Sequence, residues 1–161
     1  MSEYKNKIKV KVGDVLPYFN AFLDDGKSID ESYFKNSKYV LFFYGTDGSP
    51  TCTNEAKSVA NAYHEIQKMG FEVIGVSRDT VKSHQKFIQK ENLPYRLVAD
   101  PELHLHNVFG VYGPKIFMGK EVMGIYRTTF FINEKGVTTH IIEDVVSKQH
   151  GDQILAVLKE I

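Results

Sequence analysis

The chain has 161 residues, of which 42% are hydrophobic and 25% charged, a composition typical of an ordinary globular domain. Twenty basic side chains balance twenty acidic ones, so no net charge attracts the chain to nucleic acid or to an anionic membrane. The longest apolar run, residues 39–44, is too short to cross a bilayer, and a single cysteine excludes an internal disulfide and a cysteine-rich metal site.

The first third of the chain is predicted to form extended segments. "KIKVKV" at 7–12 alternates lysine with apolar residues, which is the pattern of an edge strand. "DDGK" at 24–27 is a turn sequence and, with its flanks, predicts a short N-terminal β-hairpin. "YVLFFY" at 39–44 is uninterrupted and apolar, as in a strand that is buried on both faces.

Helices and strands alternate in the remainder of the chain. Helical patterns cover residues 51–70, 79–94, 101–110 and 147–161. Strand patterns cover residues 71–77, 95–100, 124–133 and 136–143, the last two forming a hairpin around "NEKG". Strands connected by helices of this length favour parallel crossovers. The predicted fold is therefore α/β, a mixed central sheet flanked by helices on both faces, in one domain over residues 1–161.

The only cysteine, Cys52, lies where the strand at 39–44 gives way to a helix. Pro50 suits the first helical turn, and Ser49 before it is a good N-cap. Cys52 then lies in the first turn, where unpaired backbone N–H groups and the helix dipole favour a thiolate. The residues alone leave two interpretations open, a reactive thiol and a small buried hydrophobic side chain.

The helix terminus alone is too weak to ionise the thiol. A free cysteine is only about 3% thiolate at pH 7, and making thiolate the major form takes roughly 3.4 kcal/mol. A helix terminus supplies about 0.3–1 kcal/mol, up to about 2, and a charged hydrogen bond adds about 1.5–3. The sequence therefore predicts a cation beside the sulfur. Arg127 is the best candidate, because arginine rarely lies in a buried strand without an anion or a ligand, although a structural ion pair would also explain it.

Several ordered blocks of the chain resemble one known family. "DGSPTCTNEA" is similar to the active-site motif of the peroxiredoxins. "GVSRDTVKSHQKF", "ADPELHLHNVFGVYG" and "MGKEVMGIYRTTFFINEKG" are similar to the matching blocks of the bacterioferritin comigratory protein, or peroxiredoxin Q, subfamily. The resemblance runs from about Val12 to the C-terminus. It implies a thioredoxin-like fold and an enzyme, a thiol-dependent peroxidase that reduces hydrogen peroxide and organic hydroperoxides.

The resemblance also implies roles for individual residues. Cys52 matches the peroxidatic cysteine, Ser49 the hydroxyl residue three positions before it, and Arg127 the active-site arginine. Glu55 matches the family's glutamate and is expected to orient Arg127. The Ser49 hydroxyl and the Cys52 N–H are expected to hold the peroxide. The residues expected to shape the loop around the sulfur are Gly45, Gly48, Pro50 and Thr51. Ser49 could instead be only an N-cap, and Glu55 only a first-turn carboxylate that the dipole favours.

Two positions depart from the family pattern. Gly45 stands where the family usually has proline, which leaves the loop less rigid. Lys57 stands where many members carry a resolving cysteine, and the chain has no second cysteine. The resemblance therefore implies a one-cysteine member whose sulfenic acid is resolved by an external thiol, either a low-molecular-weight thiol or a thioredoxin-like protein. The alternative function is a cysteine-based redox sensor or binding protein without sustained turnover.

No cofactor, metal, nucleic acid or membrane partner is expected, and a cytoplasmic monomer or weak homodimer is the default. The first residues lack the apolar core of a signal peptide, and a single cysteine suits a reducing compartment. His104 and His106 lie two apart and so point in different directions on a helix. Lys82, His84 and Lys86 are expected to form a solvated helix face rather than a nucleic-acid patch.

Overall fold

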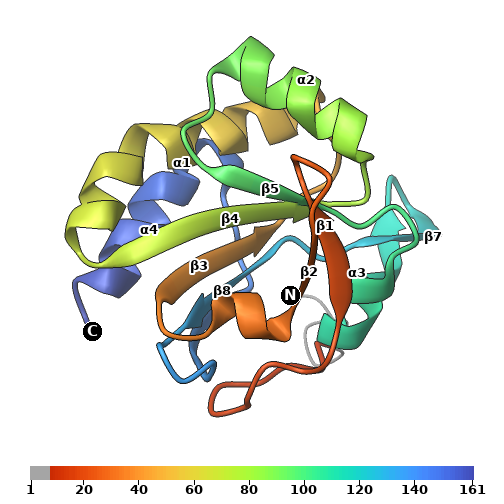
Figure 1. Ribbon diagram of the computed structural model, residues 1–161. Coiled ribbons are helices and arrows are strands. Elements are labelled where there is room, and N and C mark those ends of the chain that lie inside the picture. The colour runs from red at the N-terminus through yellow and green to blue at the C-terminus, as the bar shows by residue number, and fades with distance from the viewer. Residues whose placement is uncertain (1–7) are drawn as a thin grey trace.

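The structure is a computed structural model and describes residues 8–161 (Figure 1). Its centre is a seven-stranded sheet with the strand order β2-β1-β5-β4-β3-β8-β9. These strands are β1 (Asn20–Leu23), β2 (Ser28–Asp30), β3 (Lys38–Phe43), β4 (Phe71–Ser77), β5 (Arg96–Ala99), β8 (Thr128–Ile132) and β9 (Thr138–Ile142). β3, β4 and β5 run parallel to one another, whereas β8 is antiparallel to β3 and β9 to β8. The predicted mixed sheet is therefore confirmed, as is the N-terminal hairpin, in which β1 pairs with β2.

Helices cover both faces of this sheet. The helical elements are η2 (Glu31–Phe34), α1 (Pro50–Lys68), α2 (Val81–Glu91), α3 (His104–Phe109), η3 (Ser147–Gln149) and α4 (His150–Leu158). Figure 1 shows α1, α2 and α4 on one side of the sheet and α3 on the other. Along β3, Val40 and Phe42 belong to the core under α1 and α4, whereas Leu41 and Phe43 belong to the opposite core with α3. Because both faces of β3 are buried, its sequence is a continuous apolar run.

The N-terminal segment is the first place where the structure differs from the sequence prediction. Residues 8–12 do not form a strand, although Ile8 and Val10 are buried and alternate with exposed lysines. The backbone N–H groups of Lys9 and Val10 both donate to the carbonyl oxygen of Phe109. The segment therefore packs against the end of α3 instead of joining the sheet, and the alternation reflects this packing. Lys7, the first residue of the predicted strand, lies outside the described residues.

The strand predicted at 124–133 is divided between two sheets. β7 (Lys120–Ile125) pairs with β6 (Tyr112–Phe117) in a separate hairpin that the sequence prediction lacked, and β8 begins at Thr128. Between them the N–H of Tyr126 donates to the carbonyl oxygen of Val111, at 2.6 Å. This bond belongs to neither ladder, so the chain changes sheets at residues 126–127.

Two helix boundaries also differ from the prediction. α2 ends at Glu91 rather than near Pro94, because Asn92 takes the left-handed conformation (φ 53°) that closes a helix. α3 begins only at His104, because Leu103 is also left-handed (φ 63°). Among residues 8–161 no helix is both long and apolar enough to span a membrane.

Candidate active site around Cys52

Cys52 lies in the first turn of α1, directly beyond the C-terminal end of β3. Pro50 is the first helical residue, and the Oγ of Ser49 accepts a hydrogen bond from the Cys52 N–H at 3.2 Å. The local sequence therefore fixes where the helix starts and which turn carries the sulfur. Cys52 is only 1% exposed. The thiol is therefore buried, which by itself fits the interpretation of Cys52 as a small buried hydrophobic side chain.

The surroundings of the buried sulfur are polar. Nη2 of Arg127 lies 3.1 Å from the Sγ of Cys52, and the backbone N–H of Thr46 donates to the same atom at 3.3 Å. A charged hydrogen bond contributes about 1.5–3 kcal/mol and a helix terminus about 0.3–1. With the additional N–H, three sources of positive potential act on one sulfur, namely the guanidinium, the helix terminus and the N–H of Thr46. The structure thus brings the predicted cation to the sulfur.

Arg127 is held in place by a buried carboxylate. Its Nη1 contacts Oε1 of Glu55 at 2.5 Å, and Glu55 is fully buried. Burial alone would lower the pKa of Arg127, but the negative charges of Glu55 and of the Cys52 sulfur outweigh burial and raise that pKa. The guanidinium therefore keeps its charge, and the position of Glu55 fits the orienting role that the resemblance implied.

A histidine that the sequence analysis did not single out lies behind this carboxylate. Nδ1 of His150 is 2.8 Å from Oε2 of Glu55, a close contact that lacks the alignment of a good hydrogen bond. Its Nε2 is 2.7 Å from Oγ1 of Thr129. His150 begins α4, far along the chain from Glu55, and no local pattern ties the two residues together. Only the packing of α4 against α1 brings them into contact.

The loop between β3 and α1 is attached to the start of α2. Asp79, which follows β4, accepts hydrogen bonds from the Oγ1 of Thr46 at 3.0 Å and from the N–H of Asp47 at 2.8 Å. The carboxylate of Asp47 in turn accepts from Oγ of Ser83 at 2.8 Å and contacts Nδ1 of His84 at 2.8 Å. These contacts hold in place the loop whose Thr46 N–H points at the sulfur.

His84 does not belong to a solvated helix face as predicted. It is fully buried, and its Nε2 lies 2.9 Å from the carbonyl oxygen of Val98. The prediction was wrong because the side chain turns from α2 toward the sheet and the loop instead of toward solvent. Asp47, Asp79 and His84 each have a polar atom within 4.8 Å of the others, and these atoms already form the contacts that hold the loop.

The remaining predicted loop residues lie around the start of α1. Gly48 has a positive φ of 82°, which favours glycine, and Thr51 is exposed in the first turn. A Cβ at Gly45 would lie 3.1 Å from the Sγ of Cys52 and 3.4 Å from Nη2 of Arg127. The absence of a side chain at Gly45 therefore lets the loop backbone lie close to both the sulfur and the guanidinium.

The sequence and the fold of the chain are similar to those of known proteins. The model of the AhpC/TSA family matches residues 12–141. The chain belongs to this family. The bcp protein of Helicobacter pylori J99 is 37% identical over 147 residues, which cover 91% of this chain and 97% of the relative. Peroxiredoxin Bcp of Escherichia coli K12 is 33% identical over 151 residues, which cover 94% of this chain and 97% of the relative.

Solved structures of the family have the same fold. Peroxiredoxin Q of Xanthomonas campestris superposes with a TM-score of 0.81 at 33% identity, over 88% of this chain and 90% of its own. Another structure of the bacterioferritin comigratory protein from that organism concerns its alkyl peroxide reduction activity and has a TM-score of 0.81 at 32% identity, over 88% and 90% of the two chains. The thioredoxin-like peroxiredoxin fold that the resemblance implied is confirmed.

Proposed function

We propose that this peroxiredoxin, a thiol-dependent peroxidase by class, reduces hydrogen peroxide and organic hydroperoxides through Cys52. The observation that carries the proposal is the pair of donors on one sulfur, Nη2 of Arg127 at 3.1 Å and the N–H of Thr46 at 3.3 Å. Such donors stabilise a thiolate, which is the nucleophilic form of cysteine. They also stand where negative charge passes from sulfur to peroxide oxygen during the reaction.

The first step is attack of the Cys52 thiolate on one peroxide oxygen. An S–O bond forms and the O–O bond breaks, and the leaving oxygen takes a proton and departs as water or alcohol. The sulfur is left as sulfenic acid. We expect the peroxide to enter on the side of Gly45, whose Cα lies close to Sγ and the guanidinium. Arg127 would stabilise the charge on the oxygens, and the Ser49 hydroxyl would hold the peroxide.

The second step needs a thiol from outside the chain, because Cys52 is the only cysteine. The external thiolate attacks the sulfenic sulfur, and a second thiol releases Cys52 again. Without an internal resolving thiol, excess peroxide can oxidise the sulfenic acid further to sulfinic acid. We propose that the protein works in a reducing compartment, the cytoplasm, which maintains such thiols.

We further propose that residues 1–161 act as one domain, as a monomer or a weak homodimer. The groups around the sulfur support the single domain, since they come from the loop before α1, from α1 itself, from the segment before β8 and from α4. A site drawn from such distant parts of the chain requires them to fold together.

Peroxide consumption by the purified protein tests the proposed function. With dithiothreitol as the thiol, the parent should sustain many turnovers, Cys52→Ser none, and Arg127→Ala turnover with much slower oxidation of the sulfur. A single fast oxidation without continued turnover would favour the redox sensor. Oxidation of Cys52 no faster than that of free cysteine would overturn both.

A further inference from the structure

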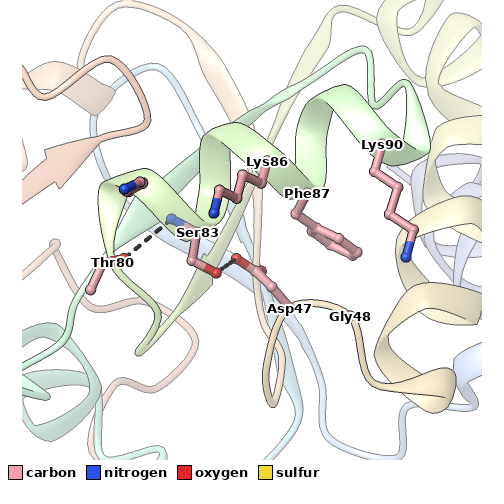
Figure 2. A pocket seen from close by; sticks show the side chains of 8 residues that line it. Asp47, Gly48, Thr80, Ser83, Lys86, Phe87 and Lys90 are labelled. Carbon is pink, nitrogen blue, oxygen red and sulfur yellow. Dashed lines mark hydrogen bonds between the residues drawn. The ribbon is translucent and has the colours of Figure 1, made fainter.

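A cavity of about 420 Å³ lies between α2 and the loop that leads to Cys52. Asp47 and Gly48 contribute its loop side, and the other lining residues are Thr80, Lys82, Ser83, Lys86, Phe87 and Lys90. Figure 2 shows Lys86, Phe87 and Lys90 projecting from α2 toward the side on which the loop runs. Its volume falls within the range of small-molecule sites, about 300–1,000 Å³.

Three lysines of this cavity bring like charges together on α2. Lys82, Lys86 and Lys90 follow one another at a spacing of four, which puts like charges on one helix face. Lys82 also lies in the first turn, where the helix dipole disfavours a cation. Within residues 8–161 none of the three forms an ion pair with a carboxylate. The chain carries no net positive charge, so a generally basic surface does not explain this cluster.

The rest of the lining leaves these positive charges available to a ligand. The one carboxylate, that of Asp47, is already bound by the hydroxyls of Tyr44 and Ser83 and by the ring of His84. Phe87 adds an apolar wall. A ligand that suits this cavity carries negative groups for the lysines and a short apolar stem.

We propose that the cavity binds the carboxylates of a small anionic thiol, the reductant of oxidised Cys52. This assignment rests on the proposed function, in which a one-cysteine enzyme takes its reducing thiol from outside. Gly48 of the cavity lies directly before Ser49, whose Oγ caps the turn that carries Cys52. A thiol anchored by its carboxylates is therefore held next to the segment that carries the sulfenic acid.

The chemistry of the bound thiol consists of two exchanges. The thiolate attacks the sulfenic sulfur of Cys52, an S–S bond forms, the S–O bond breaks, and the hydroxyl leaves with a proton as water. A second molecule of the thiol attacks the mixed disulfide and releases Cys52 as a thiol, together with the disulfide of the reductant. Two thiols are oxidised, and the two electrons reduce the sulfenic acid.

Reduction kinetics with two matched thiols test the cavity. Glutathione carries two carboxylates, and its diethyl ester presents the same thiol with both carboxylates masked. In the variant Lys82→Gln/Lys86→Gln/Lys90→Gln, kcat/KM for glutathione should fall about tenfold, which is ~1.4 kcal/mol. Reduction by the ester, and the single-turnover oxidation of Cys52 by peroxide, should stay unchanged. Added salt should lower the kcat/KM of the parent for glutathione toward the value of the variant.

The control variant Lys68→Gln/Lys135→Gln/Lys159→Gln removes the same charge from exposed positions outside the cavity. It should behave as the parent does. An equal loss in the control, or an equal loss with glutathione and its ester, would refute the lysine site. So would unchanged glutathione kinetics in the cavity variant.

A binding measurement separates this proposal from the peroxidase function. S-methylglutathione cannot react, so calorimetric titration of the reduced protein reports occupancy alone. Saturable binding to the parent and its loss in the cavity variant support the site whether or not the protein turns over peroxide. Absence of binding to the parent overturns the site, even if turnover with dithiothreitol is fast.

Discussion

Glu55 Oε2 and His150 Nδ1 lie 2.8 Å apart in the interior, where neither side chain is exposed. The other oxygen of Glu55 contacts Arg127, and Arg127 contacts the sulfur of Cys52. A row of polar contacts therefore runs from the thiol through Arg127 and Glu55 to His150, whose Nε2 contacts Oγ1 of Thr129. A buried carboxylate that loses one of two partners interacts more strongly with the one that remains. His150 thus influences how much of the positive charge of Arg127 is available to the sulfur.

His150→Asn should weaken the thiolate without removing any group that touches it. We expect a smaller thiolate fraction at neutral pH and a roughly five- to tenfold slower oxidation by hydrogen peroxide, equivalent to about 1–1.4 kcal/mol. Thiolate absorbance and stopped-flow oxidation measure the two quantities.

A double-mutant cycle shows whether this effect passes through the carboxylate. In a Glu55→Gln background, His150→Asn should change the oxidation rate much less than it does in the parent. His140→Asn on β9 serves as the control, because its only polar side-chain contact within the described chain is with Thr139. If His150→Asn lowers the unfolding temperature but leaves the thiolate fraction and rate intact, His150 is only a packing residue.

Gly45→Ala should narrow the access to the sulfur. The new Cβ would lie 3.1 Å from Sγ and 3.4 Å from Nη2 of Arg127, and the φ of Gly45 is outside the range that requires glycine. We expect oxidation by tert-butyl hydroperoxide to slow by more than oxidation by hydrogen peroxide, with an unchanged thiolate fraction. Rate constants for the two peroxides, measured side by side, test this. An equal loss for both would mean that the methyl group displaces the sulfur instead of restricting entry.

The sequence predicted the parts of the site that depend on short stretches of chain. Ser49, Pro50 and Cys52 are neighbours, and a cap, a proline and a first turn are local features with known preferences. The need for a cation followed from comparing energies, the buried-strand setting indicated Arg127, and the resemblance supplied Glu55. The position of His150, and the contacts of Asp79 and His84 with the loop, depend on how α4 and α2 pack. No local sequence pattern predicts these features.

The fold shows the same division between local and distant information. The strand at 39–44 was predictable because burial on both faces leaves a continuous apolar run. The β6–β7 hairpin was not predictable, because its residues from Ile116 to Met123 are all exposed. No alternation of apolar and polar residues therefore marks a buried face there. The alternation of lysine and apolar residues at 8–11 suggested a strand. An extended segment that packs one side against α3 produces the same two-residue alternation.

Asp100 should make the protein lose stability in acid. Burial opposes its charge, but hydrogen bonds from the His106 side chain and from the N–H groups of His106 and Leu105 outweigh burial, so the pKa of Asp100 lies below its ordinary 3.8. Since the folded-state pKa is depressed, the stabilisation is complete well above pH 3.8 and is lost as pH falls through the lower folded-state value.

Asp100→Asn tests this by urea unfolding between pH 6 and pH 3. The variant should be about 1–3 kcal/mol less stable than the parent at pH 6, and the difference should shrink toward pH 3. The exposed Glu134→Gln, in the turn between β8 and β9, is the control and should show no such trend. A difference that stays constant over this range would mean that the Asp100 charge is not what stabilises the start of α3.

Gly151→Ala should destabilise the contact between α4 and α1. A Cβ at this position would lie 2.3 Å from the carbonyl oxygen of Ser58 and 3.0 Å from the Cβ of Ala62. The Gly151 N–H also donates to Oγ of Ser58 at 2.9 Å, so the two helices approach backbone to backbone. Alanine favours a helix over glycine by about 1 kcal/mol, but the steric clash forces the helices apart and should dominate. We expect a net loss of about 1–3 kcal/mol in unfolding free energy.

The same substitution should also affect the active site, because Gly151 follows His150 in the chain. When α4 moves away from α1, His150 moves away from Glu55, and oxidation of Cys52 should slow as it does in His150→Asn. Urea unfolding and stopped-flow oxidation measure the two effects on one preparation. Ala156→Gly, at an exposed position of the same helix, should cost about 1 kcal/mol through helix propensity alone and leave the oxidation rate unchanged. A Gly151→Ala protein as stable as the parent would mean that α4 can shift without loss, and that the close approach of the two helices does not hold His150 in place.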